Sequence, residues 1–289
     1  MKTVIPYFLV LFAAVLWGTT GTATTFLPTS AQPLTIAAAR SAVGGFSLLL
    51  IMVLMKKINF HTWPWKATLV AALCMAIFQP LFFTSVRLTG IAIGTVVAIG
   101  SAPIFSGVIE WLFLKMRPSR SWAMATAMSV IGCSLLFLNK DALTVNPIGV
   151  LFSLIAGLGF AVYTIVSKAV LSKVEAIPAV AMTFSMSSLM LLPFILSFDN
   201  TWIIEPSSIS NVLYLGLMTT SVAYILFLKG LQRVPSSSAV TLSLGEPLTA
   251  AILSVFMVGE ILSPVSWIGV FLLLGGILVL TFSGRKRSK

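Results

Sequence analysis

Ten long apolar spans, separated by short loops, constrain the fold of this chain more than any other feature of its sequence. Each span has roughly the 20 residues that an α-helix needs to cross the hydrocarbon core of a bilayer. Only 9% of the 289 residues are charged, whereas a soluble domain has about 25%. The sequence therefore predicts an all-α membrane protein with ten transmembrane helices. The predicted spans are 6–26, 33–55, 66–86, 91–114, 121–139, 147–168, 177–197, 209–229, 236–258 and 264–283.

Lysine and arginine are distributed unequally between the two ends of these spans. Most of the 18 lie in loops on the side of the N-terminus, such as Lys56, Arg117 and Arg233, whereas the opposite loops contain only Arg87 and Lys140. Loops that remain in the cytoplasm are rich in Lys and Arg. We therefore predict a multi-pass protein of the cell membrane, inner or plasma, with both termini cytoplasmic. Topology explains the net charge of +11, so a nucleic-acid partner is not expected.

An internal repeat divides the chain into two halves. Residues 88–134 resemble residues 232–278 at an offset of 144 positions, and Pro103 matches Pro247. With five spans in each copy, the second copy must enter the membrane from the opposite side. Inverted repeats with kinked helices near the bilayer midplane are typical of secondary transporters, which bind their substrate between the two halves. The predicted repeats are residues 1–142 and 143–289.

Several short motifs carry a family resemblance: LeuTrpGly at 16–18, AlaAlaAlaArg at 37–40, LeuGlyGluPro at 244–247 and GlyGlu at 259–260. Together with the ten spans and the repeat, this pattern resembles the EamA-type transporters of the drug/metabolite transporter superfamily. The resemblance implies a ten-helix bundle that exports or exchanges small metabolites, often amino acids or related compounds. The first copy departs from the family pattern, because Lys and Met occupy 115–116 where the family often has GlyGlu. This departure suits a structural role for Glu260.

Glu246 is the strongest candidate for a functional residue within the spans. A charge at the bilayer centre costs about 2.5–3.5 kcal/mol on insertion scales, so it usually has a partner or a function. Glu246 could bind a cationic or amino group of a substrate, or carry a proton that couples transport. Alternatively, Glu246 could be a packing residue whose carboxylate is kept neutral by burial or is hydrogen-bonded to Ser and Thr of neighbouring helices. Pro247 is expected to kink the helix beside it, and Pro80 and Pro103 are predicted kinks of the first half.

Five further residues within the spans are candidates for substrate binding or coupling. Arg40 could bind an anionic substrate group, or its long stem could extend outwards to the headgroup layer. Gln79 could contact the substrate or form an interhelical hydrogen bond. Trp17, Tyr163 and Tyr224 could line a cavity as aromatic walls with a polar edge, or serve as ordinary packing residues.

Two more polar residues lie near predicted helix contacts. Ser101, beside Pro103, is a further candidate for substrate binding. Glu110 lies near the cytoplasmic end of its span and is expected to pair with nearby basic side chains. The glycine pairs at 44–45 and 275–276 are expected to allow close helix contact, as small residues do in membrane proteins.

Motifs for enzymatic chemistry are absent from the sequence. It contains no HExxH, GxSxG, Walker A or CxxC motif, and its only histidine, His61, lies in a predicted loop. No metal site and no cofactor are therefore predicted. Glu246 and Arg40 differ in predicted depth by several residues, which argues against an intramembrane enzyme because its reactive groups must converge.

The sequence therefore predicts a secondary transporter, not an enzyme, that works by alternating access between its two halves. The expected partners are a small-molecule substrate and the lipid bilayer, with protons or a counter-substrate as the coupling partner. A flippase for a lipid-linked substrate and a non-transporting membrane scaffold are the alternatives.

Overall fold

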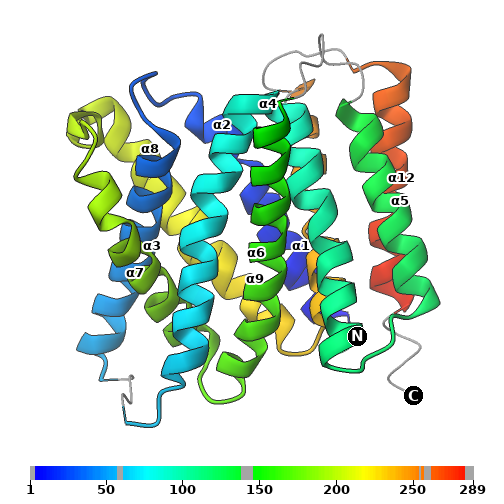
Figure 1. Cartoon of the computed structure of the whole chain (residues 1–289), viewed down its shortest axis with the longest axis horizontal. Coiled ribbons are helices and arrows are strands. Elements are labelled where there is room, and N and C mark those ends of the chain that lie inside the picture. The colour runs from blue at the N-terminus through cyan, green and yellow to red at the C-terminus, as the bar shows by residue number, and fades with distance from the viewer. Residues whose placement is uncertain (1–3, 57–60, 138–145, 254, 257–261, 284–289) are drawn as a thin grey trace.

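A computed structural model describes residues 4–56, 61–137, 146–253, 255–256 and 262–283 of the chain. Every regular element within these ranges is a helix, in agreement with the predicted all-α class. In chain order the elements are α1 (Ile5–Gly18), α2 (Thr20–Thr24), α3 (Pro33–Leu54), α4 (Trp65–Phe113), α5 (Arg120–Phe137), α6 (Pro147–Leu171), α7 (Ala176–Ile195), the 3₁₀-helix η1 (Thr201–Ile204), α8 (Pro206–Gly216), the π-helix η2 (Leu217–Val222), α9 (Ala223–Leu231), α10 (Ser236–Leu242), α11 (Gly245–Leu253) and α12 (Pro264–Ser283). The helices form one bundle, and α1 begins at the same end of the bundle at which α12 ends (Figure 1).

Eight segments in the described part of the chain are helical, long and apolar enough to cross a membrane. Each of them corresponds to one of the predicted spans. One segment combines α1 with α2, and another combines α8, η2 and α9. The eight segments are 5–24, 33–54, 65–89, 94–113, 147–171, 176–193, 206–231 and 264–283.

Two of the ten predicted spans are not among these eight segments. Span 121–139 corresponds to α5, which packs lengthwise against α12 (Figure 1). Span 236–258 is divided between α10 and α11, because the chain turns at Ser243 and Leu244. Pro247 accounts for this break, since a proline ring clashes with the carbonyl of residue i−4, here Ser243, and its nitrogen has no hydrogen to donate. Glu260 lies outside the described residues, so its predicted structural role stays a prediction.

The longest helix, α4, contains two of the predicted spans. A straight helix of 49 residues would be about 74 Å long, more than twice the thickness of the hydrocarbon core. Instead, α4 reverses between Thr89 and Gly94, and its two limbs cross the bundle in opposite directions (Figure 1). Gly94 permits the reversal, because a Cβ at this position would lie 2.8 Å from Cα of Val86. Pro80 lies in the first limb and Pro103 in the second, and the helix continues past both.

Close glycine contacts join helices of the two halves. A Cβ at Gly132 of α5 would lie 2.7 Å from the carbonyl oxygen of Gly269 and 2.7 Å from the amide nitrogen of Leu273, both in α12. A Cβ at Gly276 of α12 would lie 2.7 Å from the carbonyl oxygen of Ala125 in α5. Residues without a side chain allow this close approach of two backbones, as is common between membrane helices. The two helices therefore pack with almost no tolerance for added volume.

Gly132→Ala is expected to lower the midpoint temperature of thermal unfolding in detergent. The new Cβ would overlap backbone atoms of α12, and overpacking of this kind costs about 1–3 kcal/mol. Gly21→Ala is the matched control, because no atom lies within 4 Å of a Cβ placed there and alanine favours a helix over glycine by about 1 kcal/mol. An unchanged midpoint for Gly132→Ala would contradict the close contact of α5 with α12.

Candidate functional site

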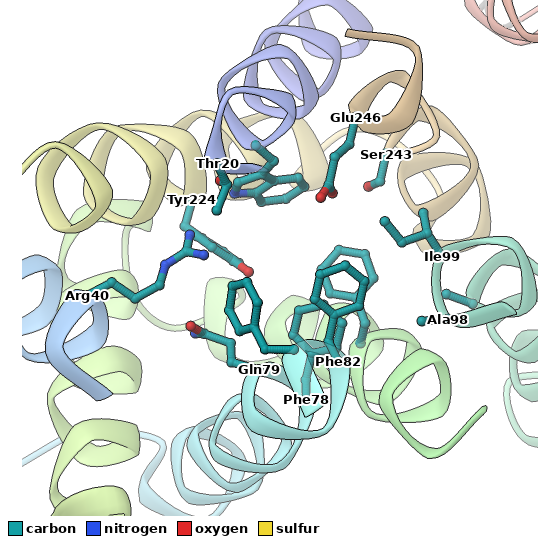
Figure 2. A pocket seen from close by; sticks show the side chains of 14 residues that line it. Thr20, Arg40, Phe78, Gln79, Phe82, Ala98, Ile99, Tyr224, Ser243 and Glu246 are labelled. Carbon is teal, nitrogen blue, oxygen red and sulfur yellow. The ribbon is translucent and has the colours of Figure 1, made fainter. Parts of the chain in front are cut away.

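A cavity lies within the bundle among α1, α2, α3, both limbs of α4, α6, α9 and α11 (Figure 2). The space in it that the centres of water molecules can occupy is about 40 Å³, enough for roughly three waters. Five of the seven residues predicted to bind or couple line it, namely Trp17, Arg40, Gln79, Tyr224 and Glu246. The other lining residues are Thr20, Phe78, Phe82, Phe83, Ala98, Ile99, Ala102, Phe160 and Ser243.

Arg40 is held with its guanidinium group at the wall of the cavity. Its side chain is only 6% exposed, and Nε donates to the hydroxyl of Thr220 at 3.0 Å. Nη2 donates to the hydroxyl of Thr219 at 2.9 Å and to its carbonyl at 3.1 Å. Nη1 has no hydrogen-bond partner among the described residues, so its two N–H groups are available to a ligand. The alternative in which the stem extends outwards to the headgroups is therefore wrong.

The π-helix η2 provides the acceptors that hold Arg40. The hydroxyls of Thr219 and Thr220 both donate to the carbonyl of Leu215, at 2.8 and 2.9 Å. The hydroxyl of Ser221 donates to the carbonyl of Gly44 in α3 at 2.9 Å. Short π-helical segments inside α-helices are frequent at functional sites. The predicted span 209–229 does not distinguish this π-helical segment. The signal for it in the sequence is the run of three successive hydroxyl residues in an apolar span, since such side chains compete for backbone carbonyls.

Trp17, in the last turn of α1, also binds to η2. Its indole Nε1 donates to the carbonyl of Thr219 at 3.1 Å, so one carbonyl accepts from both Trp17 and Arg40. The indole ring lies 4.8 Å from the ring of Tyr224 and 5.9 Å from that of Phe160, measured between centroids. Trp17 thus both forms the aromatic wall and fixes α1 against η2.

Glu246 lies on the opposite side of the cavity from Arg40 (Figure 2). It occupies the first turn of α11, where the helix dipole stabilises a negative charge. No described residue forms a hydrogen bond to its carboxylate, which is directed into the cavity (Figure 2). Although the sequence predicts that Glu246 and Arg40 differ in depth by several residues, both side chains line this one cavity.

Gln79 connects the first limb of α4 to α3. Its side chain is 3% exposed, and Nε2 donates to the hydroxyl of Ser41 at 3.3 Å. The hydroxyl of Ser41 donates in turn to the carbonyl of Ala37 at 2.7 Å. The amide oxygen Oε1 of Gln79 is buried and has no partner among the described residues. The predicted interhelical hydrogen bond is therefore present, and it uses only the donor end of the amide.

Tyr163 and Ser101 do not line the cavity. Tyr163 is fully buried behind the wall, where its ring lies 5.8 Å from that of Tyr224 and 6.2 Å from that of Phe160. The hydroxyl of Ser101 donates to the carbonyl of Ala98 at 3.2 Å, and its side chain lies against Gly157 of α6. Both residues therefore contribute to packing around the site.

Glu110 also lies outside the cavity, at the end of α4. Its carboxylate is buried and accepts a hydrogen bond from the backbone N–H of Ser236, the first residue of α10, at 2.8 Å. Lys168 of α6 is close enough to interact with it electrostatically. The predicted interaction with a basic residue is thus secondary to a direct bond that joins α4 to α10.

Comparisons with known proteins agree with this architecture. The chain matches the sequence model of the EamA-like transporter family twice, over residues 4–138 and 147–282. An uncharacterised transporter of Bacillus subtilis (strain 168), YwfM, is 46% identical over 99% of this chain and 97% of its own. Protein PecM of Dickeya dadantii (strain 3937) is 28% identical over 96% of this chain and 94% of its own.

The fold is also found in a solved structure. A protein known from its crystal structure superposes on this chain with a TM-score of 0.82 and covers 97% of this chain and 98% of its own, at 20% sequence identity. At this identity the likeness shows a shared fold. The two family matches together extend over nearly the whole sequence. The chain is therefore a member of the EamA-like transporter family.

Proposed function

We propose that this transporter carries a small zwitterionic metabolite, such as an amino acid, and exports or exchanges it by alternating access. The observation that carries the proposal is the placement of Arg40 and Glu246 on opposite sides of one small cavity (Figure 2). Nη1 of Arg40 offers two N–H donors to a carboxylate, and the Glu246 carboxylate offers acceptors to an ammonium group. A substrate with both groups would satisfy both charged side chains at once.

Without a ligand, Arg40 and Glu246 are two charged side chains in an apolar interior. Charged groups in an apolar interior are normally paired and hydrogen-bonded, because burial of an isolated charge is very unfavourable. Arg40 and Glu246 are not hydrogen-bonded to each other in the described part of the chain, although both line the same cavity. A zwitterion placed between them would neutralise each charge locally without joining the two side chains directly.

The remaining walls favour a substrate with an apolar body. Phe78, Phe82 and Phe160 line the cavity together with the ring of Trp17, and pockets for small molecules usually combine such walls with a few polar groups. The free space holds about three waters, so a larger substrate requires the helices around it to move apart. This requirement supports a mechanism in which the two halves move relative to each other around the site.

The contact between α5 and α12 supports two inverted repeats of five spans, with α5 and α10–α11 as the two additional spans. The offset of 144 residues exchanges Gly132 with Gly276, and Ala125 with Gly269. Under this exchange, the contact between Gly132 and Gly269 corresponds to a contact between Gly276 and Ala125. The structure contains both contacts. Reciprocal contacts of this kind are expected of two copies related by a two-fold axis. The separate family matches at 4–138 and 147–282 agree with repeats 1–142 and 143–289.

The positions of the charged residues support the predicted orientation. Lys56, Lys115 and Arg233 are exposed at the end of the bundle where α1 begins, whereas Asp199 and Glu205 are exposed at the other end. An excess of Lys and Arg marks the cytoplasmic side. We infer that both termini face the cytoplasm of a cell whose inner or plasma membrane contains the protein.

Transport by the purified protein in proteoliposomes tests the substrate proposal. The vesicles are loaded with labelled amino acids, with amino amides that lack the carboxylate, and with 2-hydroxy acids that lack the ammonium group. We expect the protein to accelerate release of the zwitterions in preference to either analogue. If release of every zwitterion is the same with and without protein, the proposed substrate class is wrong. Release from intact cells that express the chain then tests the proposed direction of transport.

A further inference from the structure

We propose that Gln79 selects, among zwitterionic substrates, those that carry an additional O–H or N–H donor on their apolar part. This inference rests on the proposed function and adds a third contact to the two charged ones. The contact would be made by the amide oxygen Oε1 of Gln79, which is buried in the cavity wall with no partner among the described residues.

The orientation of the Gln79 amide follows from its hydrogen-bond network. The hydroxyl hydrogen of Ser41 is used on the carbonyl of Ala37 at 2.7 Å, so the Ser41 oxygen can only accept from Gln79. The nitrogen end of the amide must therefore face Ser41, as the 3.3 Å bond from Nε2 indicates. Oε1 is then the end without a partner, and it can only accept a hydrogen bond. It is covered in this structure, so a substrate reaches it when the helices around the cavity move apart, as the proposed function requires.

A buried acceptor without a partner is costly, and this cost turns Oε1 into a selective group. A substrate that offers no donor leaves this oxygen unpaired in the occupied cavity, and its binding free energy is less favourable for that reason. A substrate with a hydroxyl or N–H group forms the hydrogen bond and avoids this cost. Sites built to hydrogen-bond a substrate hydroxyl reject the analogue that lacks it far more strongly than apolar pockets distinguish hydrocarbons. Gln79 is therefore placed to distinguish isosteric substrates.

The neighbours of Gln79 indicate where on the substrate this donor lies. Phe78 and Phe82 line the cavity from the same limb of α4 as Gln79, and Arg40 extends from the adjacent α3 (Figure 2). A substrate whose carboxylate binds Arg40 would place its apolar part against the two phenyl rings, with Gln79 beside it. The substrate class is thus an amino acid with an apolar body and one hydrogen-bond donor on its side chain.

Paired substrates of nearly equal shape test this inference in proteoliposomes. The pairs are threonine with valine and tyrosine with phenylalanine, and the readout is the ratio of initial rates at low concentration. We expect the wild-type protein to prefer the hydroxyl-bearing member of at least one pair by about tenfold or more. Gln79→Met is expected to bring that ratio close to one while transport of the member without the hydroxyl is retained. Ser41→Ala, which releases the amide from its anchor, is expected to give an intermediate ratio.

The control is Gln32→Met, because Gln32 lies outside the cavity, where its side chain accepts from Arg87; it should keep the wild-type ratio. Equal rates for both members of each pair in the wild-type protein would overturn the inference even if Gln79→Met does not fold. An equal loss for both members in Gln79→Met would also overturn it, since this result would show that Gln79 acts only on Arg40 or on the packing of α4 with α3. If no zwitterion is transported at all, the proposed function itself fails, and this outcome is distinct from transport without preference.

Discussion

Replacing Arg40 with methionine is expected to reduce transport of a zwitterionic substrate below saturation by roughly 100-fold. Methionine is unbranched like the stem of arginine, but it is shorter and offers no donor, so the substrate carboxylate would enter the cavity without its partner and face the negative Glu246. Truncation of one member of a buried, hydrogen-bonded charge pair typically costs about 2–5 kcal/mol. The initial rate of release from proteoliposomes measures this effect.

Two comparisons distinguish loss of binding by Arg40 from loss of structure. Arg87→Met removes an exposed arginine outside the cavity and should leave the rate unchanged. Arg40→Lys keeps the charge but cannot reproduce the planar fork that reaches Thr219 and Thr220, so partial transport is expected. A rate for Arg40→Met within about threefold of wild type would contradict a role for Arg40 in binding the substrate.

Glu246→Gln is expected to reduce transport of the same zwitterion by roughly 30-fold, because the amide keeps the size of the side chain but removes the charge that pairs with the ammonium group. A 2-hydroxy acid, which has the carboxylate but no ammonium group, should lose little or nothing in this variant. Glu205→Gln, at an exposed position outside the cavity, is the control. An equal loss for the zwitterion and the hydroxy acid would contradict binding of the ammonium group by Glu246.

A role of Glu246 in proton coupling leads to a different result in the same vesicles. In that case a pH gradient would accelerate net flux through the wild-type protein, and Glu246→Gln would abolish this acceleration while zwitterion-for-zwitterion exchange continued. Flux that does not respond to the gradient would exclude the proton role. The transport of the hydroxy acid and the response of flux to a pH gradient, measured together, therefore distinguish a role of Glu246 in substrate binding from a role in proton coupling.

The fold class could be predicted because each apolar span is long enough to cross a bilayer, and most of the spans reappear as helices. The sequence predicts a kink at Pro247 but does not predict the interruption between α10 and α11. Hydropathy does not register whether a proline bends a helix or ends it. Pro80 and Pro103 lie inside α4, whereas Pro247 lies in the first turn of a new helix. The difference depends on tertiary packing around each proline.

Candidate site residues could be found in the sequence because polar groups in apolar spans are rare and costly. Their convergence could not, since depth along separate helices depends on helix tilt, on the break before Glu246 and on η2. Ser101 and Tyr163 illustrate the limit, because their chemistry resembles that of Gln79 and Tyr224 but their helix faces turn towards Gly157 or into the packed interior. The rotation of a helix about its own axis decides whether a residue lines the cavity or packs in the interior. Amino-acid composition does not predict this rotation.

The π-helical segment at Leu217–Val222 has a consequence for how relatives of this protein can diverge. An α-helix rotates by about 100° per residue, and a π-helical turn contains about one residue more than an α-helical turn. Loss of a single codon in this segment would therefore convert the π turn into an α turn, and Tyr224 and the rest of α9 would keep their orientation in the bundle. The hydroxyls of Thr219 and Thr220, which bind Arg40 from this turn, would change position instead. Deletion of one residue, as well as substitution, is thus a route by which transporters of this kind can alter how a binding residue is held while the helix beyond it stays in place.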